Sequence, residues 1–200
     1  MADKGNVPLG AVARLLHRQC VGPLTTIDDA RPGDAAAIAE LYAHHVLHGT
    51  ATFETVPPDA TEMAERLAKV TGAGWPWLVA RGSDGAVVGY AYAAQLRERA
   101  AYRFACENSI YIRDDARGQR IGTALMERLL PASTTAGFRQ MFAVIAGTEP
   151  ASIALHTRFG FAHCGLLKAA GRKFGRWIDV VYMQAALGEG DTTPPPVEPA

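Results

Sequence analysis

The residues best suited to binding a phosphate lie in a polar, glycine-containing loop, 117–122. An alternating, strand-like stretch, 108–113, runs into this loop, and the loop opens a helix whose first apolar residue is Ile121. A helix N-terminus presents unpaired backbone N–H groups at the positive end of the helix dipole, which attracts anions. No Gly-Lys-Ser/Thr follows the glycines and a tight Gly-x-Gly-x-x-Gly is missing, so neither a nucleotide-hydrolysing P-loop nor a dinucleotide-binding turn is expected. A pyrophosphate held by backbone amides, without a metal-binding hydroxyl, suggests coenzyme A.

Glu107 is a candidate general base. It follows a segment of apolar or small residues, 104–106, shortly before the phosphate-binding loop, where a carboxylate is hard to explain as packing. An ammonium group must lose a proton before it can attack a thioester, and a carboxylate beside the acceptor can take that proton directly or through water. The alternative is a glutamate on an edge strand that faces water, since buried unpaired glutamates are rare. The residue pattern alone leaves both interpretations open.

His156 and an arginine pair supply the other reactive groups. His156 lies two turns into the helix expected after strand 138–146, where an imidazole could protonate a leaving thiolate. The alternative is a histidine at the edge of the core that is satisfied by a backbone carbonyl, with water supplying the proton. Arg97 and Arg99 share one side of a segment expected to be extended, so their guanidinium groups could clamp a carboxylate and a second oxygen-bearing group. The alternative there is a solvated charged loop.

Two further groupings are weaker candidates for chemistry. His44 and His48 form an i, i+4 pair on one helical face, but the sequence suggests neither a carboxylate partner nor a third ligand, so no metal site is expected. Cys106 precedes Glu107 in a strand, where neighbouring side chains point to opposite faces. We expect Cys106 to be a buried, unreactive thiol.

Composition limits the class of protein. The chain has 200 residues, of which 48% are hydrophobic, which is enough to bury a substantial core. Lys plus Arg and Asp plus Glu number 20 each, so no nucleic-acid or anionic-membrane partner is expected. No apolar run approaches the roughly 20 residues that span a bilayer, and the start lacks the pattern of a secretory signal. Cys20, Cys106 and Cys164 are widely spaced without Cys-x-x-Cys, which favours reduced thiols in a cytoplasm.

The elements that must position these residues alternate along one central domain, 25–187. Apolar periodicity predicts helices that begin after an N-cap at Asp34 and at Asp59, where Glu62 completes a capping-box-like pair, and further helices over 120–136 and 150–160. Alternation predicts strands over 25–30, 75–81, 86–96, 104–113, 138–146, 161–167 and 177–187. Residues 1–24 form an expected extension with a short amphipathic helix within 7–22. The Pro-rich tail 188–200 is expected to be disordered.

The phosphate-binding loop resembles the acetyl-CoA loop of the GNAT acetyltransferase superfamily, which reads Gln/Arg-x-x-Gly-x-Gly/Ala. Arg117 and Gly122 match the ends of that pattern, whereas Arg120 stands at the position of its middle glycine. The predicted order of elements is also that of GNAT proteins. The resemblance implies an α/β (α+β) GNAT fold, with a mixed, mostly antiparallel central sheet and helices on both faces.

Further motifs are similar to those of the phosphinothricin and methionine-sulfoximine N-acetyltransferase family, over roughly residues 26–187. They are Ala51-Thr52-Phe53-Glu54-Thr55, Gly89-Tyr90-Ala91-Tyr92-Ala93, Arg97-x-Arg99-x-Ala101-Tyr102, Glu107-x-Ser109-Ile110-Tyr111, Ser152-Ile153-x-Leu155-His156 and Gly171-x-Lys173-x-Gly175-x-Trp177-x-Asp179. Each motif is weak alone, but together they recur in one order. The resemblance implies a homodimer that transfers acetyl from acetyl-CoA to the α-amine of a small amino-acid analogue such as phosphinothricin, methionine sulfoximine or methionine sulfone.

The resemblance also implies roles for individual residues. Glu107 corresponds to the family's catalytic base, and His156 lies where many GNAT proteins carry a tyrosine that serves as general acid. The implied substrate-binding residues are Phe53, Arg97, Arg99, Tyr102, Lys173 and Trp177, although core packing accounts for Phe53 and Trp177 almost as well. The implied cofactor-binding residues are Ile110, Tyr111, Ile112, Arg117, Gly118, Gln119, Arg120, Ile121, Gly122, Thr123, Glu149 and Ser152. Glu149 stands where the family usually has asparagine.

Two other classes of function stay open. Arg120 and Glu149 make a non-catalytic CoA-binding sensor conceivable, but Glu107 and the arginine pair argue against it. A protein, lysine or other amine N-acetyltransferase would need an open and often acidic groove for a peptide, whereas this candidate site is basic and aromatic.

Overall fold

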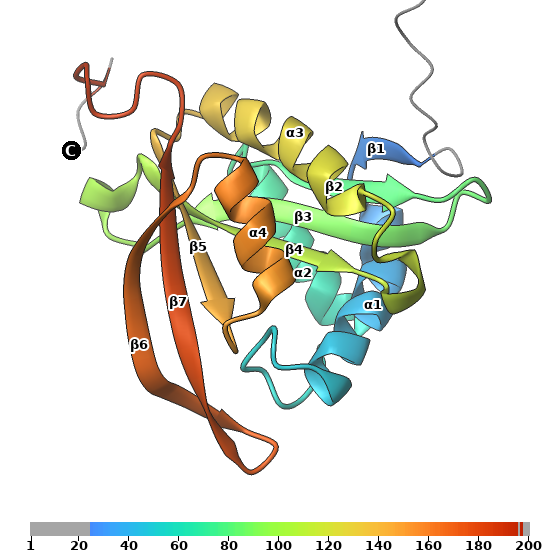
Figure 1. The fold of residues 1–200 in the computed structure, drawn as a ribbon. Helices are drawn as coiled ribbons and strands as arrows, with labels where there is room; N and C mark the ends of the chain where they lie inside the picture. Colours follow the sequence, from blue (N-terminus) through green and yellow to red (C-terminus); the bar gives the residue numbers. More distant parts are fainter. Residues whose placement is uncertain (1–24, 196, 198–200) are drawn as a thin grey trace, which may run out of the picture.

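One seven-stranded sheet runs through the molecule in the order β1-β2-β3-β4-β5-β7-β6 (Figure 1). The structure is a computed structural model that describes residues 25–195 and 197, so the helix expected within 7–22 lies outside the described residues. Neighbouring strands are antiparallel except β4 and β5, which are parallel, so the predicted mixed, mostly antiparallel sheet is confirmed. The strands are β1 (Thr26–Asp29), β2 (Trp77–Arg81), β3 (Val87–Gln95), β4 (Ala105–Ile112), β5 (Gln140–Ala146), β6 (Ala162–Lys173) and β7 (Arg176–Ala186).

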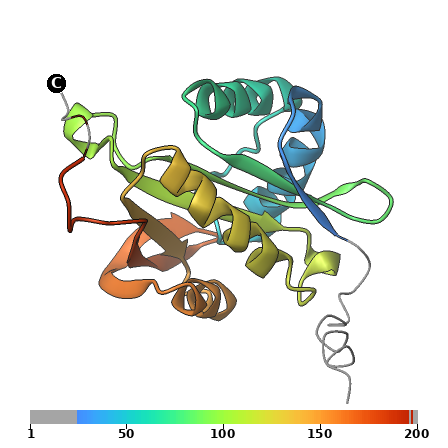
Figure 2. The same cartoon turned by 90° about the horizontal axis from the view of Figure 1, so that it is seen from above.

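Helices cover both faces of the sheet, as Figure 2 shows from above. Helices α1 (Ala35–His48) and α2 (Ala60–Gly72) pack on one face, and α3 (Ile121–Thr135) and α4 (Pro150–Arg158) pack on the other. The short 3₁₀ helices are η1 (Pro32–Asp34), η2 (Ala100–Tyr102) and η3 (Asp114–Ala116). A central strand between two helical layers is buried on both sides, which explains why Trp77, Leu78, Val79 and Ala80 are all buried. No helix among residues 25–195 has the length and apolar content needed to cross a bilayer.

The two parallel strands β4 and β5 separate halfway along their length. Their pairing covers only four positions and ends at Asn108 and Ala143. Beyond this point β4 stays paired with β3 through Ile112, while β5 stays paired with β7 through Ala146. Because each strand stays paired with a different neighbour, β4 and β5 diverge, and one edge of each is left without a strand partner. This opening positions the candidate site.

The β6–β7 hairpin is longer than the predicted strands 161–167 and 177–187. Strand β6 continues to Lys173, and β7 begins at Arg176. The register between the two strands is irregular from Leu167 to Gly171, and Ala169 adopts a positive φ of 51°. These irregularities interrupt the strict alternation by which strands are recognised in a sequence. The prediction therefore ended β6 too early.

One other prediction, the N-cap of α1, needs correction. Asp34 does not cap α1 with its side chain; its carboxylate instead accepts hydrogen bonds from the backbone N–H of Arg31, at 2.8 Å, and from the Arg81 guanidinium, at 2.8 and 2.9 Å. The side chain of Asp59 does cap α2, accepting from the backbone N–H of Glu62 at 2.9 Å. In the first part of the Pro-rich tail, 188–195, the structure has turns, and the Arg139 guanidinium donates to the carbonyl of Gly190 at 3.2 Å.

Candidate active site

A cleft of about 510 Å³ occupies the opening between β4 and β5. Several predicted cofactor residues line it: Ile110, Tyr111, Ile112, Arg117, Gly118, Glu149 and Ser152. The cleft also has a wall that was not predicted to contact a cofactor, formed by the end of α1 and by residues around the split. This wall includes His44, His45, His48, Gly49, Thr50, Ala51, Asn108, Ser109, Leu155 and Arg176. No local pattern connects these positions, because strand order and helix packing bring them together.

The loop before α3 uses two left-handed residues. Gly118 has a φ of 75°, as its flexibility allows, and Arg120 has a φ of 62° and a ψ of 14° at the N-cap of α3. A left-handed backbone costs a non-glycine residue about 1–2 kcal/mol. Arg120 therefore adopts the conformation for which the family pattern uses glycine. The loop is therefore strained at the position where the family pattern has its middle glycine.

The remaining loop residues contribute mainly backbone. Ile121 is buried in the core under α3, so its side chain is not free to contact a cofactor. Gly122 lies against α4, where an added Cβ would come within 3.1 Å of Leu155 Cδ2. The Gln119 amide donates to the Asp115 carbonyl at 3.1 Å. The amides of Ile121, Gly122 and Thr123 fall in the first turn of α3, where a helix offers no internal acceptor. These N–H groups fit the predicted anion cradle.

Glu107 lies on the face of β4 that α1 and α2 cover. Alternation puts it on the same face as Tyr111, which packs on the α1/α2 core, and opposite to Cys106, which belongs to the other core. Its Cα partner in β3 is Ala94, and the side chain is half-buried. Burial raises the pKa of Glu107 above its usual range, and the nearby Arg97 guanidinium opposes that shift. A carboxylate with a raised pKa is suited to taking a proton from an ammonium group.

His156 lies on the opposite side of the sheet and is 3% exposed. Its Nδ1 is 2.7 Å from the carbonyl oxygen of Ser152, one turn earlier in α4, and its Nε2 is 2.9 Å from the amide nitrogen of Asn108. Burial lowers the pKa of His156, which favours the neutral ring. This geometry matches the alternative that the sequence left open, a histidine satisfied by a backbone carbonyl. The general-acid role stays a prediction.

Cys106 has the environment expected of an inert thiol. It is fully buried, and burial raises its pKa to about 12.

The arginine pair lies in a bend rather than in an extended strand. Strand β3 ends at Gln95, and Arg97 and Arg99 are both exposed in the segment that leads to η2. The Gln95 side-chain amide donates to the carbonyl of Arg97 at 2.5 Å and to that of Arg99 at 3.2 Å, which holds the bend. Arg97 is near enough to Glu107 to lower its pKa. Tyr102, in η2, is exposed as well.

The α1–α2 loop is attached to the β6–β7 hairpin by two predicted substrate residues. Lys173 is 5% exposed, and its ammonium donates to the backbone carbonyl of Thr52 at 2.9 Å. The ring of Phe53 lies against the backbone of Gly171 and is 40% exposed. Lys173 therefore holds the loop that carries Phe53. Trp177 is 64% exposed, with the Arg172 guanidinium 5.3 Å from its ring centroid, so it is not a core residue.

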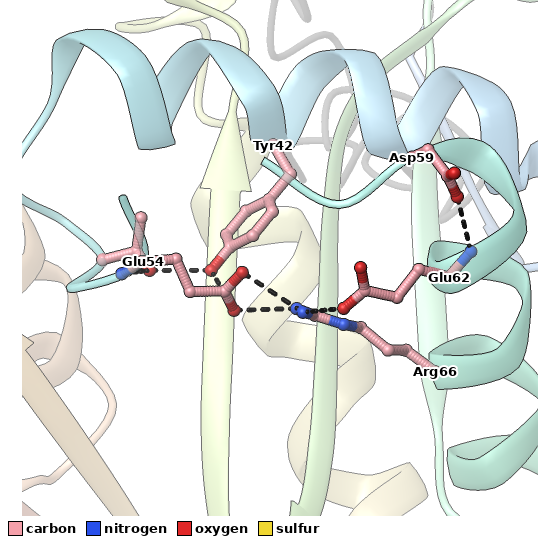
Figure 3. A network of polar contacts seen from close by, with 6 residues as sticks. Tyr42, Glu54, Asp59, Glu62 and Arg66 are labelled. Carbon is pink, nitrogen blue, oxygen red and sulfur yellow. Dashed lines mark hydrogen bonds and ion pairs between the residues drawn. The ribbon is translucent and has the colours of Figure 1, made fainter. Parts of the chain in front are cut away.

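A polar network holds the same loop on both sides of Phe53, at Thr52 and at Glu54 (Figure 3). Glu54 accepts two hydrogen bonds from the Arg66 guanidinium, at 2.8 and 3.2 Å, and one from the Tyr42 hydroxyl, at 3.0 Å (Figure 3). The Tyr42 hydroxyl also lies 2.7 Å from the Thr52 hydroxyl. Burial raises the pKa of Tyr42 to about 12, so its hydroxyl keeps its proton. Only Thr52 and Glu54 belong to a motif recognised in the sequence, and Tyr42 and Arg66 were not predicted to lie at the site.

The histidines at the end of α1 have a carboxylate partner that the sequence did not suggest. His44 Nε2 lies 2.8 Å from an oxygen of Asp114 in η3, and His45 Nε2 lies 3.1 Å from the carbonyl of Ile112. The ring centroids of His44 and His48 are 4.9 Å apart. Within residues 25–195 no group of three or more potential ligands is arranged to hold a metal ion.

Comparison with known proteins agrees with this geometry. Residues 27–182 match the acetyltransferase (GNAT) domain family. The chain is 50% identical, over 85% of its length and 86% of the relative's, to a phosphinothricin N-acetyltransferase of Alcaligenes faecalis. It is 34% identical, over 84% of its length and 98% of the relative's, to an L-methionine sulfoximine/L-methionine sulfone acetyltransferase of Pseudomonas paraeruginosa.

A solved structure shares the fold. The crystal structure of a GNAT superfamily phosphinothricin acetyltransferase from Sinorhizobium meliloti in complex with acetyl-CoA superposes with a TM-score of 0.84 at 51% identity, covering 86% of this chain and 92% of that one. This relative binds the cofactor that the anion cradle and the cleft indicate here. The chain therefore belongs to the GNAT acetyltransferases, in the phosphinothricin and methionine sulfoximine acetyltransferase family of acetyl-CoA-dependent N-acetyltransferases.

Proposed function

We propose that this protein transfers the acetyl group of acetyl-CoA to the α-amine of a small amino-acid analogue of the phosphinothricin, methionine sulfoximine or methionine sulfone type. The supporting observation is the position of Glu107 at the point where β4 and β5 separate. Glu107 pairs with Phe142 in the last paired stretch of the two strands, and the cleft begins at the next pair, Asn108 and Ala143. A carboxylate next to the inner end of a cleft suited to a thioester-bearing arm supports the role of general base that we propose for Glu107.

Acetyl-CoA supplies the activated acetyl group, and the residues of this chain bind and orient it. The first-turn amides of α3 hold its pyrophosphate, and the unpaired edges of β4 and β5 flank its pantetheine arm. Glu107 takes the proton of the acceptor ammonium, directly or through water, so that the neutral amine can attack the thioester carbonyl. The thiolate that leaves is reprotonated by water or by His156.

The acceptor is held on the α1/α2 side of the sheet, where Glu107 lies. Arg97 is the cation that acts on the Glu107 carboxylate, and we assign it to the α-carboxylate of the acceptor. Phe53, held by Gly171 and Lys173 through the α1–α2 loop, forms an apolar wall. Arg99, Tyr102 and Trp177 are exposed and would contact the outer end of the acceptor. A free amino acid satisfies both charges of such a site, whereas a peptide or a lysine side chain lacks the carboxylate beside its amine.

We propose that the protein works as a homodimer in a cytoplasm. The β6–β7 hairpin exposes Leu166, Leu167, Phe174 and Trp177, each about half exposed or more, and a second copy would cover this apolar surface. Cys106 and Cys164 are both free thiols, as a reducing compartment requires. Light scattering should give about twice the chain mass of 21.3 kDa. A mass of one chain at micromolar concentration contradicts the dimer.

An acceptor screen that measures released CoA thiol tests the function. Phosphinothricin, methionine sulfoximine and methionine sulfone should release CoA with saturation, and histone-like peptides should release little. Preferred acetylation of peptides would replace the proposal with a protein acetyltransferase. CoA binding without turnover of any amine would instead indicate a sensor domain.

A further inference from the structure

The hydrogen bonds of His156 define its tautomer. Nδ1 lies 2.7 Å from a carbonyl oxygen, that of Ser152, which can only accept, so the ring proton is on Nδ1. In the neutral ring Nε2 then carries a lone pair and can only accept. Nε2 lies 2.9 Å from the side-chain amide of Asn108, so the group facing it must be the NH₂. Two contacts thus determine which way the Asn108 amide is turned.

The other end of that amide has no partner. Asn108 is 6% exposed, and its Oδ1 is buried without a hydrogen bond from any residue that the structure describes. A buried carbonyl oxygen with no donor costs about 1–3 kcal/mol, and such groups are rare in folded proteins. The amide cannot turn over to relieve this cost, because its oxygen would then face the Nε2 lone pair of His156. His156 therefore keeps an unsatisfied acceptor in place.

This acceptor is located where the cofactor arm must end. Asn108 is the last β4 residue paired with β5, and it lines the cleft together with Ser109, Ala143 and His156. It lies on the sheet face opposite to Glu107, since neighbouring strand residues alternate. The pantetheine arm of CoA carries two secondary amides, each with one N–H donor, whereas the thioester offers only acceptors. The arm therefore provides the kind of group that Asn108 lacks.

On the basis of the proposed function, we propose that Asn108 is a cofactor-positioning residue whose Oδ1 accepts a hydrogen bond from a pantetheine amide N–H of acetyl-CoA. His156 is a positioning residue in this arrangement, because it acts on the cofactor through Asn108. Since both ring nitrogens are engaged by Asn108 and Ser152, water is the one of the two proton donors left open above that reprotonates the thiolate. Neither the phosphate cradle nor Glu107 depends on this pair.

Calorimetry with two ligands tests the contact. Asn108→Leu keeps the branched shape of the side chain and removes the acceptor, so it should weaken binding of CoA and acetyl-CoA by about three- to tenfold. Adenosine 3′,5′-bisphosphate lacks the pantetheine arm, and its affinity should be unchanged. Ser133→Ala is a matched control, because Ser133 Oγ is also buried without a partner but lies near the end of α3. Equal affinity of wild type and Asn108→Leu for CoA, or an equal loss for both ligands, overturns the proposal.

The role of His156 is tested by two substitutions and a spectrum. His156→Gln retains an acceptor for the Asn108 amide and should keep CoA affinity close to wild type, whereas His156→Leu should lose CoA affinity as Asn108→Leu does. A large fall in kcat for His156→Gln with intact CoA binding would instead establish a general acid. Nitrogen NMR of the wild-type protein should show the Nδ1-protonated tautomer of His156, and an Nε2-protonated ring would refute the arrangement even if a variant fails to fold.

Wild-type protein that binds no CoA would refute the proposed function, whereas wild-type binding that Asn108→Leu leaves intact refutes only this inference.

Discussion

The ring of Phe53 lies so close to Gly171 that a Cβ added at residue 171 would be 2.1 Å from the ring's Cε1. This contact joins the α1–α2 loop to the β6–β7 hairpin, next to the hydrogen bond from Lys173 to Thr52. The position of a proposed acceptor-binding ring thus depends on the absence of a side chain on another element.

Gly171→Ala should therefore damage acceptor binding more than folding. The added methyl must displace the Phe53 ring, which is 40% exposed and can move towards solvent. We expect the KM for the acceptor to rise by about tenfold, with a loss of less than about 1 kcal/mol in the free energy of unfolding. Gly165→Ala in the same strand meets no atom within 4 Å and is the control. Equal KM values for the two variants would remove Phe53 from the acceptor site.

Glu107→Gln should lower activity and raise stability at the same time. Loss of a general base typically lowers kcat by about 10²–10⁴-fold. Because the pKa of Glu107 is raised in the folded protein, the folded state binds this proton more tightly than the unfolded chain does. The stabilisation of the folded state by this proton is fully present at pH values below the pKa of Glu107 in the unfolded chain. It is lost as pH rises through the pKa of Glu107 in the folded protein, so at neutral pH the ionised carboxylate weakens the fold.

The pH dependence of the melting temperature checks the sign of this effect. Glu107→Gln should melt above wild type at pH 7, and the difference should fade towards about pH 4, near the unfolded pKa of glutamate. Glu127→Gln, at an exposed position of α3, should change neither the melting temperature nor kcat. Wild-type turnover by Glu107→Gln across the pH range would exclude Glu107 as the base.

Arg120→Gly should stabilise the protein without abolishing cofactor binding. The substitution relieves the strain of a left-handed backbone at the N-cap of α3. Glycine also adds chain entropy to the unfolded state, which offsets part of that gain and leaves an increase of about 0.5–1 kcal/mol in the free energy of unfolding. CoA affinity should stay within about tenfold if the backbone amides hold the pyrophosphate. Denaturant unfolding and calorimetry measure the two quantities. A larger loss of affinity would show that the Arg120 side chain binds a phosphate.

Arg97→Ala should affect both the acceptor and the base. Loss of a charged hydrogen-bonding partner should lower kcat/KM for a free amino-acid acceptor by about tenfold to a hundredfold. Because the Arg97 guanidinium lowers the pKa of Glu107, its removal should also shift the acidic limb of the kcat/KM profile to higher pH. Arg99→Ala should lower kcat/KM without this shift. If wild type acetylates amidated methionine sulfone as well as the free acid, the carboxylate clamp is wrong.

Features that depend on neighbouring residues could be predicted from the sequence. The cap of α2 by Asp59, the strand that carries Glu107 and the loop that opens α3 follow from periodicity and short-range hydrogen bonding, which operate within one turn or one strand. The buried character of Cys106 follows from the same alternation. The loop residues suggested coenzyme A, and the resemblance to a known family added the acetyl group and the mixed, mostly antiparallel character of the sheet.

Only the tertiary structure decided which distant residues meet. Asn108 and His156 are 48 positions apart, and Lys173 and Thr52 are 121 apart, so no periodicity relates the members of either pair. The left-handed conformation of Arg120 and the irregular β6 likewise reflect packing that overrides local preference. The cleft itself exists because β4 stays paired with β3 while β5 stays paired with β7, and such an opening is a property of the assembled sheet rather than of any one segment.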